Sequence, residues 1–201
     1  MITLTAVAKW LYDRFEINKV LVVAPLRVAE DTWTKESDKW DHLCGLRVVR
    51  VLGSQAQRVS ALRTEADIYC INRENVPWLV KYYGVAWPFD GVVLDELSSF
   101  KNPSAKRFRA MRKVRPLIKH IVGLTGTPSP NGLIDLWAQM YLLDGGERLG
   151  RTLTEYRSRY FVPGRRNGYI VYDWVPKPGA EEEIYPVSYT HLRAHETKAN
   201  L

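Results

Sequence analysis

The chain has 201 residues, of which 29 are Lys or Arg and 22 are Asp or Glu, so its formal net charge is +7. Its hydrophobic fraction of 46% and charged fraction of 25% are typical of globular proteins and exclude disordered, collagen-like and low-complexity chains. This length suits one sizeable globular domain, with or without an appendage, and predicts a true hydrophobic core.

Two further classes of protein are disfavoured. The longest apolar runs, such as Val20 to Pro25, are far shorter than the ~20 residues that cross a bilayer, and the chain opens with no secretory leader. The two cysteines, Cys44 and Cys70, are too few for a disulfide scaffold or a zinc cluster. We therefore expect a soluble, cytoplasmic protein with reduced thiols, no membrane partner and no metal bound by Cys and His.

The apolar pattern between residues 3 and 143 alternates between short β-rich runs and longer helical stretches. This alternation is typical of parallel βαβ units and predicts an α/β fold, a parallel sheet flanked by helices. We expect strands at residues 20–24, 46–51, 67–71, 91–94 and 120–124. Helices are expected at residues 3–15, 28–40, 55–64, 76–83, 104–114 and 133–143.

The sequence changes character after Asp144. Glycines at 145, 146 and 150 precede an aromatic and arginine-rich helical stretch at 154–160, and Asn167-Gly168 before residues 169–174 is a hairpin signal. We interpret residues 1–144 as one α/β lobe and residues 145–186 as a small α+β extension of that lobe, with a helix and a hairpin.

A basic segment lies between Lys101 and Lys119, where the sequence holds eight basic residues and no acidic one. One interpretation is the solvated face of a helix, in which Ala105, Phe108 and Met111 face the core and the basic side chains point outward. The other is a surface that binds a polyanion, because Lys and Arg side chains that neutralise phosphates supply sequence-independent affinity. The sequence leaves both open.

Two segments carry residues suited to chemistry, and both follow predicted strands, where parallel sheets place their functional loops. The first is the apolar run that ends in Asp95-Glu96, which could hold Mg²⁺ and orient a water near a γ-phosphate, or simply cap a helix. The second is residues 123–131, where two hydroxyls flank Gly126. Its plainer interpretation is a Gly/Pro turn that leads into the next helix.

Together these segments resemble motifs II and III of the Swi/Snf-like branch of helicase superfamily two, and residues 21–26 resemble its motif Ia. The similarity extends from about residue 2 to residue 185, and segments 27–33 and 176–185 are most similar to the compact versions carried by bacteriophages and prophages. The residues that carry it are Asp95-Glu96, Phe100-Lys101-Asn102, Leu124-Thr125-Gly126-Thr127-Pro128, Asn131, Leu136-Trp137, Trp33 and Trp40.

The resemblance implies an ATP-driven motor that moves on double-stranded DNA, with ATP and Mg²⁺ bound between two RecA-like lobes. This chain would be an incomplete first RecA-like lobe, and the second lobe of the same protein would be its partner. By the resemblance, Asp95 would bind Mg²⁺ through water, Glu96 would activate the hydrolytic water, and Thr125 and Thr127 would couple the state of the nucleotide to the DNA-contacting surface.

The resemblance also implies a nucleic-acid surface after the first strand and after the acidic pair. The family usually has Ala-His after that pair, whereas this chain has Leu97-Ser98, in which Ser98 could still form a hydrogen bond. The residues assigned to DNA are Pro25, Leu26, Arg27, Lys101, Asn102, Lys106 and Arg107.

The two ends of the chain lack expected features. A P-loop needs a glycine-rich turn that ends in Gly-Lys-Ser/Thr, and none of the 13 glycines is followed by Lys. We expect that the chain begins shortly after the P-loop of a longer protein. Residues 187–197 resemble one reading frame of a sequencing-library adapter, which predicts that residues 187–201 are a non-native tail. A native polar tail is the alternative.

The sequence as a whole predicts a fragment of an ATP-dependent DNA translocase or helicase, encoded by a phage or prophage and active in the cytoplasm of a bacterial host. The parent would be a DNA-dependent ATPase, and this fragment alone would be inactive because both lobes must close on ATP. Two alternatives stay open. One is the helicase subunit of a restriction or nuclease system, and the other is a non-catalytic DNA-binding module that uses the basic segment and residues 151–166.

Overall fold

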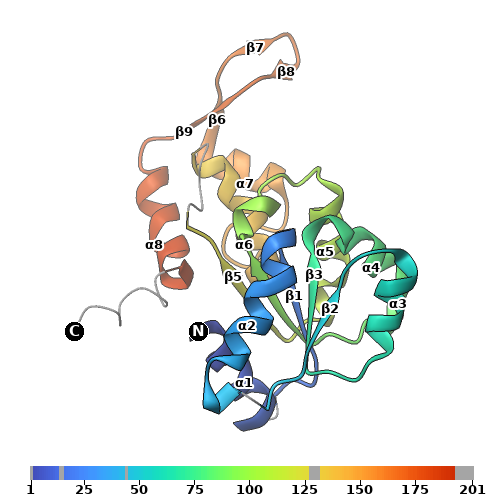
Figure 1. The fold of residues 1–201 in the computed structure, drawn as a ribbon. Helices are drawn as coiled ribbons and strands as arrows, with labels where there is room; N and C mark the ends of the chain where they lie inside the picture. Colours follow the sequence, from blue (N-terminus) through green and yellow to red (C-terminus); the bar gives the residue numbers. More distant parts are fainter. Residues whose placement is uncertain (1, 14–15, 44, 127–131, 193–201) are drawn as a thin grey trace, which may run out of the picture. The chain divides into compact units, whose positions relative to one another are not determined.

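The computed structural model describes residues 2–13, 16–43, 45–126 and 132–192 (Figure 1). The chain forms two compact units. The first comprises residues 1–96 and 109–124, and the second comprises residues 97–108 and 125–201. The predicted division at residue 144 and the predicted non-native tail stay predictions, and residues 193–201 of that tail lie outside the described part of the chain.

The first unit is built around a five-stranded sheet with the strand order β2-β3-β1-β4-β5 (Figure 1). Every neighbouring pair is parallel, so each connection must cross over the sheet, usually through a helix. The predicted parallel α/β fold is therefore confirmed. The strands are β1 (Val20–Ala24), β2 (Val48–Val51), β3 (Ile68–Asn72), β4 (Gly91–Asp95) and β5 (His120–Leu124).

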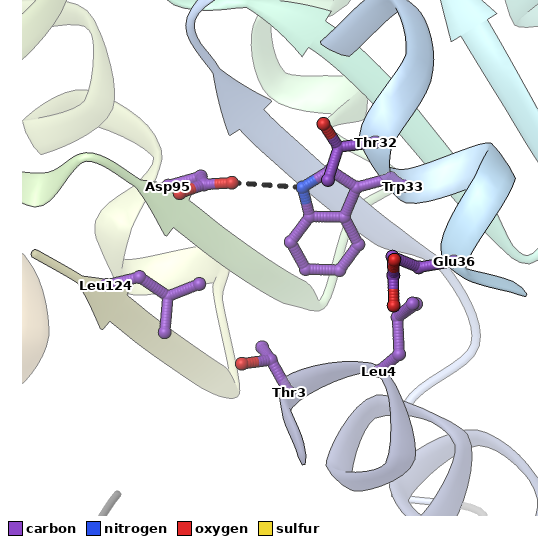
Figure 2. A pocket seen from close by; sticks show the side chains of 7 residues that line it. All are labelled: Thr3, Leu4, Thr32, Trp33, Glu36, Asp95 and Leu124. Atoms are coloured by element: carbon purple, nitrogen blue, oxygen red, sulfur yellow. Dashed lines mark hydrogen bonds between the residues drawn. The ribbon is translucent and has the colours of Figure 1, made fainter. Parts of the chain in front are cut away.

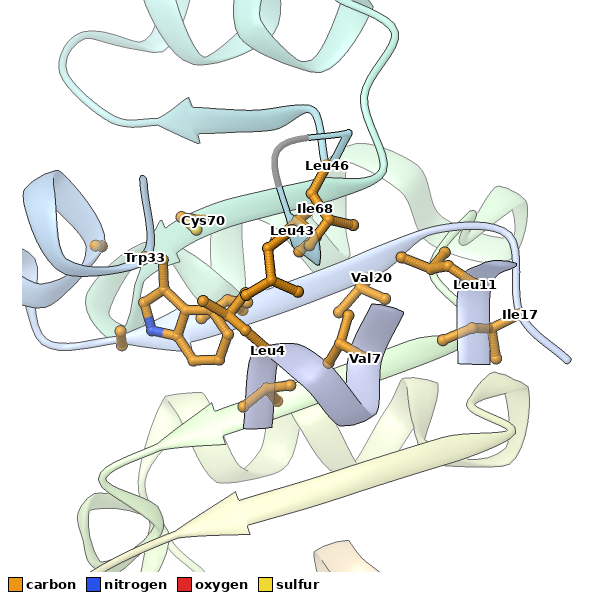
Figure 3. Packing of buried hydrophobic residues seen from close by; sticks show 14 residues of the cluster. Leu4, Val7, Leu11, Ile17, Val20, Trp33, Leu43, Leu46, Ile68 and Cys70 are labelled. Carbon is orange, nitrogen blue, oxygen red and sulfur yellow. The ribbon is translucent and has the colours of Figure 1, made fainter. Parts of the chain in front are cut away.

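Apolar side chains cover both faces of this sheet, which explains why its central strands are apolar at nearly every position. All five residues of β1 are buried. On one face, alternate residues of β1 and β3 pack against α1 (Ile2–Ala8) and α2 (Trp33–Asp38) (Figure 3). On the other, Tyr69 of β3 stacks edge-on against Phe89, which in turn contacts Tyr83.

The remaining helices of the first unit connect the strands. α1 continues as a π-helical turn (Lys9–Asp13), and a second π-helical turn (Val28–Thr32) leads into α2. Ser54 begins α3 (Gln55–Arg63) with a reciprocal capping box to Gln57, and α4 (Val76–Tyr83) has the bounds that the sequence predicts. Short 3₁₀ turns lie at Asp41–Leu43, Arg73–Asn75, Gly84–Ala86 and Arg115–Leu117.

The helix α5 (Lys106–Val114) is strongly amphipathic, as its sequence predicts. Phe108 and Met111 are buried, whereas Lys106 and Arg109 are exposed. Ala105 lies just before the first turn and is half-buried. The basic residues of α5 therefore lie mainly on a solvent-facing side.

The second unit packs around Trp137 of α6 (Leu136–Asp144), whose ring contacts those of Phe108 and Tyr141. Tyr156 of α7 (Leu153–Tyr160) is buried and donates a 2.7 Å hydrogen bond to the carbonyl of Leu133. The other elements are the 3₁₀ turns Leu97–Phe100 and Leu133–Asp135, the strands β6 (Phe161–Pro163), β7 (Arg166–Asn167), β8 (Ile170–Val171) and β9 (Trp174–Pro176), and α8 (Ala180–Leu192).

The predicted hairpin is confirmed, but its strands are shorter and more irregular than expected. Asn167 pairs with Ile170, so the two central residues of the turn are Gly168 and Tyr169. Gly168 has φ 57°, a conformation that glycine adopts without strain. Between β8 and β9 the hairpin is irregular, and there the Asp173 carboxylate accepts hydrogen bonds from the backbone and guanidinium of Arg165.

Two carboxylates tie the amino ends of the strands of the first unit together. Asp90 accepts hydrogen bonds from the backbone N–H groups of Asn18 and Lys19, at 2.9 and 3.1 Å. Asp67 is buried and accepts from the backbone and guanidinium of Arg47 and from the Tyr12 hydroxyl. These carboxylates lie at the end of the sheet opposite to the carboxyl ends of the strands.

Among the residues that the structure describes, every helix is too short or too polar to span a bilayer. The thiol of Cys70 is fully buried in the sheet, and burial raises its pKa to about 12. Cys70 is therefore a protonated core side chain, whereas Cys44 lies outside the described residues.

Candidate functional site

Two of the segments singled out by the sequence directly follow parallel strands of the first unit. β4 ends at Asp95 and is followed by Glu96, and β5 ends at Leu124 and is followed by Thr125. Asp95 and Leu124 are register partners in the sheet. Side chains at this edge are positioned by the sheet itself, which makes it the natural place for a site in an open α/β fold.

The carboxylate of Asp95 is the best-defined group of this edge. Its Oδ2 accepts a 3.1 Å hydrogen bond from the indole Nε1 of Trp33 (Figure 2). Burial raises the pKa of the Asp95 carboxyl above its ordinary value. The bond from Trp33 opposes this rise, and the negative charge of Glu96 adds to it. The folded chain therefore holds a partly desolvated carboxylate that a cation would stabilise.

Glu96 has an unusual backbone conformation. Its φ is 66°, and it is the only non-glycine residue of the described chain with positive φ. A left-handed conformation costs an L-residue roughly 1–2 kcal/mol, so the surrounding fold must hold it in place. This conformation ends β4 abruptly and directs the chain into the 3₁₀ turn Leu97–Phe100.

A cavity of about 150 Å³ adjoins the Asp95 carboxylate within the first unit (Figure 2). Its walls come from α1, from the segment around Trp33, and from the ends of β4 and β5. In Figure 2 the indole of Trp33 lies between Asp95 on one side and Glu36 on the other. The lining residues are Thr3, Leu4, Thr32, Trp33, Glu36, Asp95 and Leu124.

Of the two threonines assigned to nucleotide sensing, the structure describes Thr125 but not Thr127. The Oγ1 of Thr125 is buried and has no hydrogen-bond partner among the residues that the structure describes. A buried hydroxyl without a partner is costly, so it is available to a ligand or a water. Thr127, Pro128 and Asn131 lie outside the described residues.

The segment assigned to DNA after β1 is accessible. Leu26 and Arg27 are exposed and Pro25 is half-buried, so a partner could reach this segment. Leu26 and Arg27 are helical, and the carbonyl of Pro25 accepts the backbone N–H of Ala29, so this segment is the first turn of the helical stretch that continues into the π-helical turn. Its role in binding DNA stays a prediction.

The residues assigned to DNA after β4 lie in the second unit, and three of the four have internal partners. Lys101 forms a 3.3 Å ion pair with Asp135, Arg107 donates to the carbonyl of Ser99, and Asn102 accepts from the backbone of Ser104. Lys106 is exposed. Lys101, Asn102 and Arg107 therefore already form contacts within the second unit. Binding to DNA would have to preserve or replace these contacts.

The donor set of this edge suits Mg²⁺ better than a transition metal. Mg²⁺ is usually bound through one or two carboxylates, with waters and phosphates completing its shell. Asp95 and Glu96 could supply such carboxylates, and in the described part of the chain no three or more His, Cys, Asp or Glu side chains are grouped so that they could together hold a metal ion. The partly desolvated carboxylate of Asp95 fits a magnesium ion that also binds nucleotide phosphates.

This fold and this edge define a class of protein, the RecA-like α/β lobes of nucleotide-dependent enzymes. The chain belongs to the family of SNF2-related domains, whose model matches residues 1–157.

Similar proteins come from phages, archaea and animals. The chain is 43% identical over 174 residues to protein p41 of Acyrthosiphon pisum secondary endosymbiont phage 1. This match covers 82% of this chain and 38% of p41. It is 30% identical over 161 residues to the mouse DNA excision repair protein ERCC-6-like, covering 76% of this chain and 12% of that protein. The chain thus spans well under half the length of these relatives.

Solved structures show the same fold. The SWI2/SNF2 ATPase core of Sulfolobus solfataricus, determined in complex with double-stranded DNA, matches with a TM-score of 0.62 and 28% identity, over 78% of this chain and 31% of that one. The predicted fold and family are confirmed by this match and by the family model.

Sequence reasoning missed one residue of the site. Trp33 contributes to the motif Ia resemblance, but no role follows from its position, 62 residues before Asp95. Its helical segment follows directly on the π-helical turn Val28–Thr32, a feature often found near functional sites. Only the folded chain brings its indole to the carboxylate.

Proposed function

We propose that this chain is part of the first lobe of an ATP-driven motor that moves on double-stranded DNA. The observation that carries the proposal is the Asp95-Glu96 pair at the carboxyl edge of a parallel sheet, in a chain of the SNF2-related family. Its similarity to an ATPase core determined with double-stranded DNA supports the choice of polymer. The similarity to a phage protein supports a bacterial host.

In this proposal the two acids have separate tasks. Through water, Asp95 would hold Mg²⁺, which would supply neutralising charge at the nucleotide phosphates. Glu96 lies next to it, outside the strand, and orients the attacking water and accepts its proton. Thr125, whose hydroxyl has no partner among the described residues, responds to the nucleotide.

The segment Pro25–Arg27 and the exposed basic side chains of α5 would contact DNA phosphates in this proposal. Such contacts give affinity that falls steeply with salt and carries little sequence preference. A motor that moves along DNA needs contacts of this kind, because base-specific contacts would hold it in place.

The test is DNA-stimulated ATP hydrolysis by a chimera in which residues 1–186 replace the matching segment of phage protein p41. We expect the chimera to hydrolyse ATP faster with double-stranded DNA than without it. The 201-residue chain alone should show no DNA-stimulated hydrolysis, because catalysis requires closure around the nucleotide. Unmodified p41 is the control for the grafted framework.

Two results would favour the alternative functions. DNA binding by the chimera that is steeply salt-dependent but indifferent to ATP would favour a non-catalytic DNA-binding module. Hydrolysis that appears only with an added nuclease subunit would favour the restriction or nuclease system. Hydrolysis by p41 but not by the folded chimera would contradict the proposal for this chain.

A further inference from the structure

The indole of Trp33 is directed at the carboxylate of Asp95, and its partner is a side chain rather than the backbone. The Nε1 to Oδ2 distance is 3.1 Å, and Trp33 is only 5% exposed. Two other buried tryptophans, Trp87 and Trp137, donate their indole N–H groups to backbone carbonyls, at 2.8 and 3.0 Å. Those bonds satisfy buried indole donors, but they do not involve a side chain of the candidate site.

The position of the Trp33 ring is fixed by its packing. Trp33 belongs to the apolar cluster between the sheet and the first helices, together with Leu4 and Val7 (Figure 3). A large ring held in a close-packed cluster has little rotational freedom, so its N–H group points in one direction. Asp95 therefore meets a preorganised donor.

The chemistry of this donor is one-sided. The indole nitrogen donates and cannot accept, and it carries no charge. It can therefore fix one oxygen of the Asp95 carboxylate without neutralising it or competing with a bound cation. Among the described residues, the other charged or titratable groups that act on the carboxylate or share its cavity are Glu96, Glu36 across the cavity and the Cys70 thiol, and none of these is a cation.

We propose that Trp33 is a positioning residue, whose indole N–H orients the Asp95 carboxylate so that this carboxylate can hold a divalent cation at the cavity. The inference rests on the proposed function, because it assumes that Asp95 is the metal-binding carboxylate. Donors that orient a metal-binding carboxylate commonly set its affinity, and their loss typically costs about 10- to 100-fold.

The experiment uses the 201-residue chain with ¹⁵N-labelled tryptophan and Mn²⁺ alone as the probe. The variants are Trp33→Phe, Trp87→Phe and Asp95→Asn. Trp33→Phe removes the N–H donor and keeps an aromatic ring, and Trp87→Phe makes the same change at a buried tryptophan of the same unit. Indole resonances report the environment of each donor, and electron paramagnetic resonance of free Mn²⁺ reports the affinity.

We expect Mn²⁺ to broaden the Trp33 indole resonance before that of Trp87, and Asp95→Asn to shift the Trp33 resonance. Trp33→Phe should weaken Mn²⁺ binding about 10-fold, whereas Trp87→Phe should leave it unchanged.

Equal Mn²⁺ affinity in the two Phe variants would overturn the positioning role and leave the proposed function standing. If the Trp33 indole resonance does not shift in Asp95→Asn, the hydrogen bond between the Trp33 indole and the Asp95 carboxylate does not exist. Absence of Mn²⁺ binding by the wild-type chain would remove the metal assignment of Asp95, and this proposal with it.

Discussion

Replacing Glu96 with Gln in the chimera should abolish DNA-stimulated ATP hydrolysis while sparing ATP binding. Gln has nearly the same shape as Glu but cannot accept the proton of the attacking water. Loss of a positioned general base typically costs about 10²- to 10⁴-fold in rate. We expect turnover to fall by at least about 100-fold, measured as phosphate release with saturating double-stranded DNA.

The matched control is Glu65→Gln, which removes one negative charge just before the amino end of β3, away from the carboxyl edge. The Glu65 side chain is 82% exposed and pairs only loosely with Arg47, at 3.6 Å. Its turnover should match that of the parent chimera. Retained turnover in Glu96→Gln, with Glu65→Gln also active, would remove Glu96 from its assigned role.

Replacing Asp67 with Ala should destabilise the 201-residue chain more than any surface change. The carboxylate of Asp67 is buried and joins three segments, because it accepts from the Arg47 backbone at 2.8 Å and from the Tyr12 hydroxyl at 3.0 Å. Its loss leaves these donors without their acceptor, at a cost of about 2 to 3 kcal/mol. Urea unfolding followed by tryptophan fluorescence at neutral pH measures the change.

The same residue predicts a dependence on pH. Burial would raise the pKa of Asp67, but the hydrogen bonds from Arg47 and Tyr12 outweigh burial and hold this pKa below its ordinary value. The stabilisation is therefore complete above the unfolded pKa of about 4 and is lost as the pH falls through the lower folded pKa. The difference between wild type and Asp67→Ala should shrink on acidification below about pH 4.

Asp31→Ala is the control for this prediction, because Asp31 is exposed and pairs with Lys35 on the same surface. It should leave the urea midpoint unchanged. A difference between wild type and Asp67→Ala that stays constant or grows on acidification would show that the carboxylate is not stabilising in its charged form.

The strands of the first unit could be predicted well, because a strand that is buried on both faces is apolar at nearly every position. β1 and β5 have the predicted bounds, β2 begins two residues later than predicted, β4 ends one residue later, and β3 is shifted by one residue at both ends. Helix geometry was harder to predict. The expected helices at 3–15 and 28–40 contain π-helical turns, whose hydrogen bonds shift by one residue without changing the apolar pattern.

The site could be predicted only as far as strand ends can be read from the sequence. Asp95 and Glu96 follow an apolar run, so their place at the carboxyl edge was predictable. The contact with Trp33 depends on how α2 packs against β4, which no local pattern encodes. The partners of Lys101 and Arg107 likewise come from folding, since a basic segment looks the same whether its side chains are free or paired.

Movement along double-stranded DNA is the central claim, and displacement of the third strand from a triplex by the chimera tests it most directly. A motor that moves along the duplex strips the third strand without needing to unwind the duplex. We predict displacement that requires ATP and Mg²⁺, that fails with Glu96→Gln and that persists with Glu65→Gln. ATP hydrolysis stimulated by duplex DNA without any displacement would contradict the claim that this chain belongs to a motor.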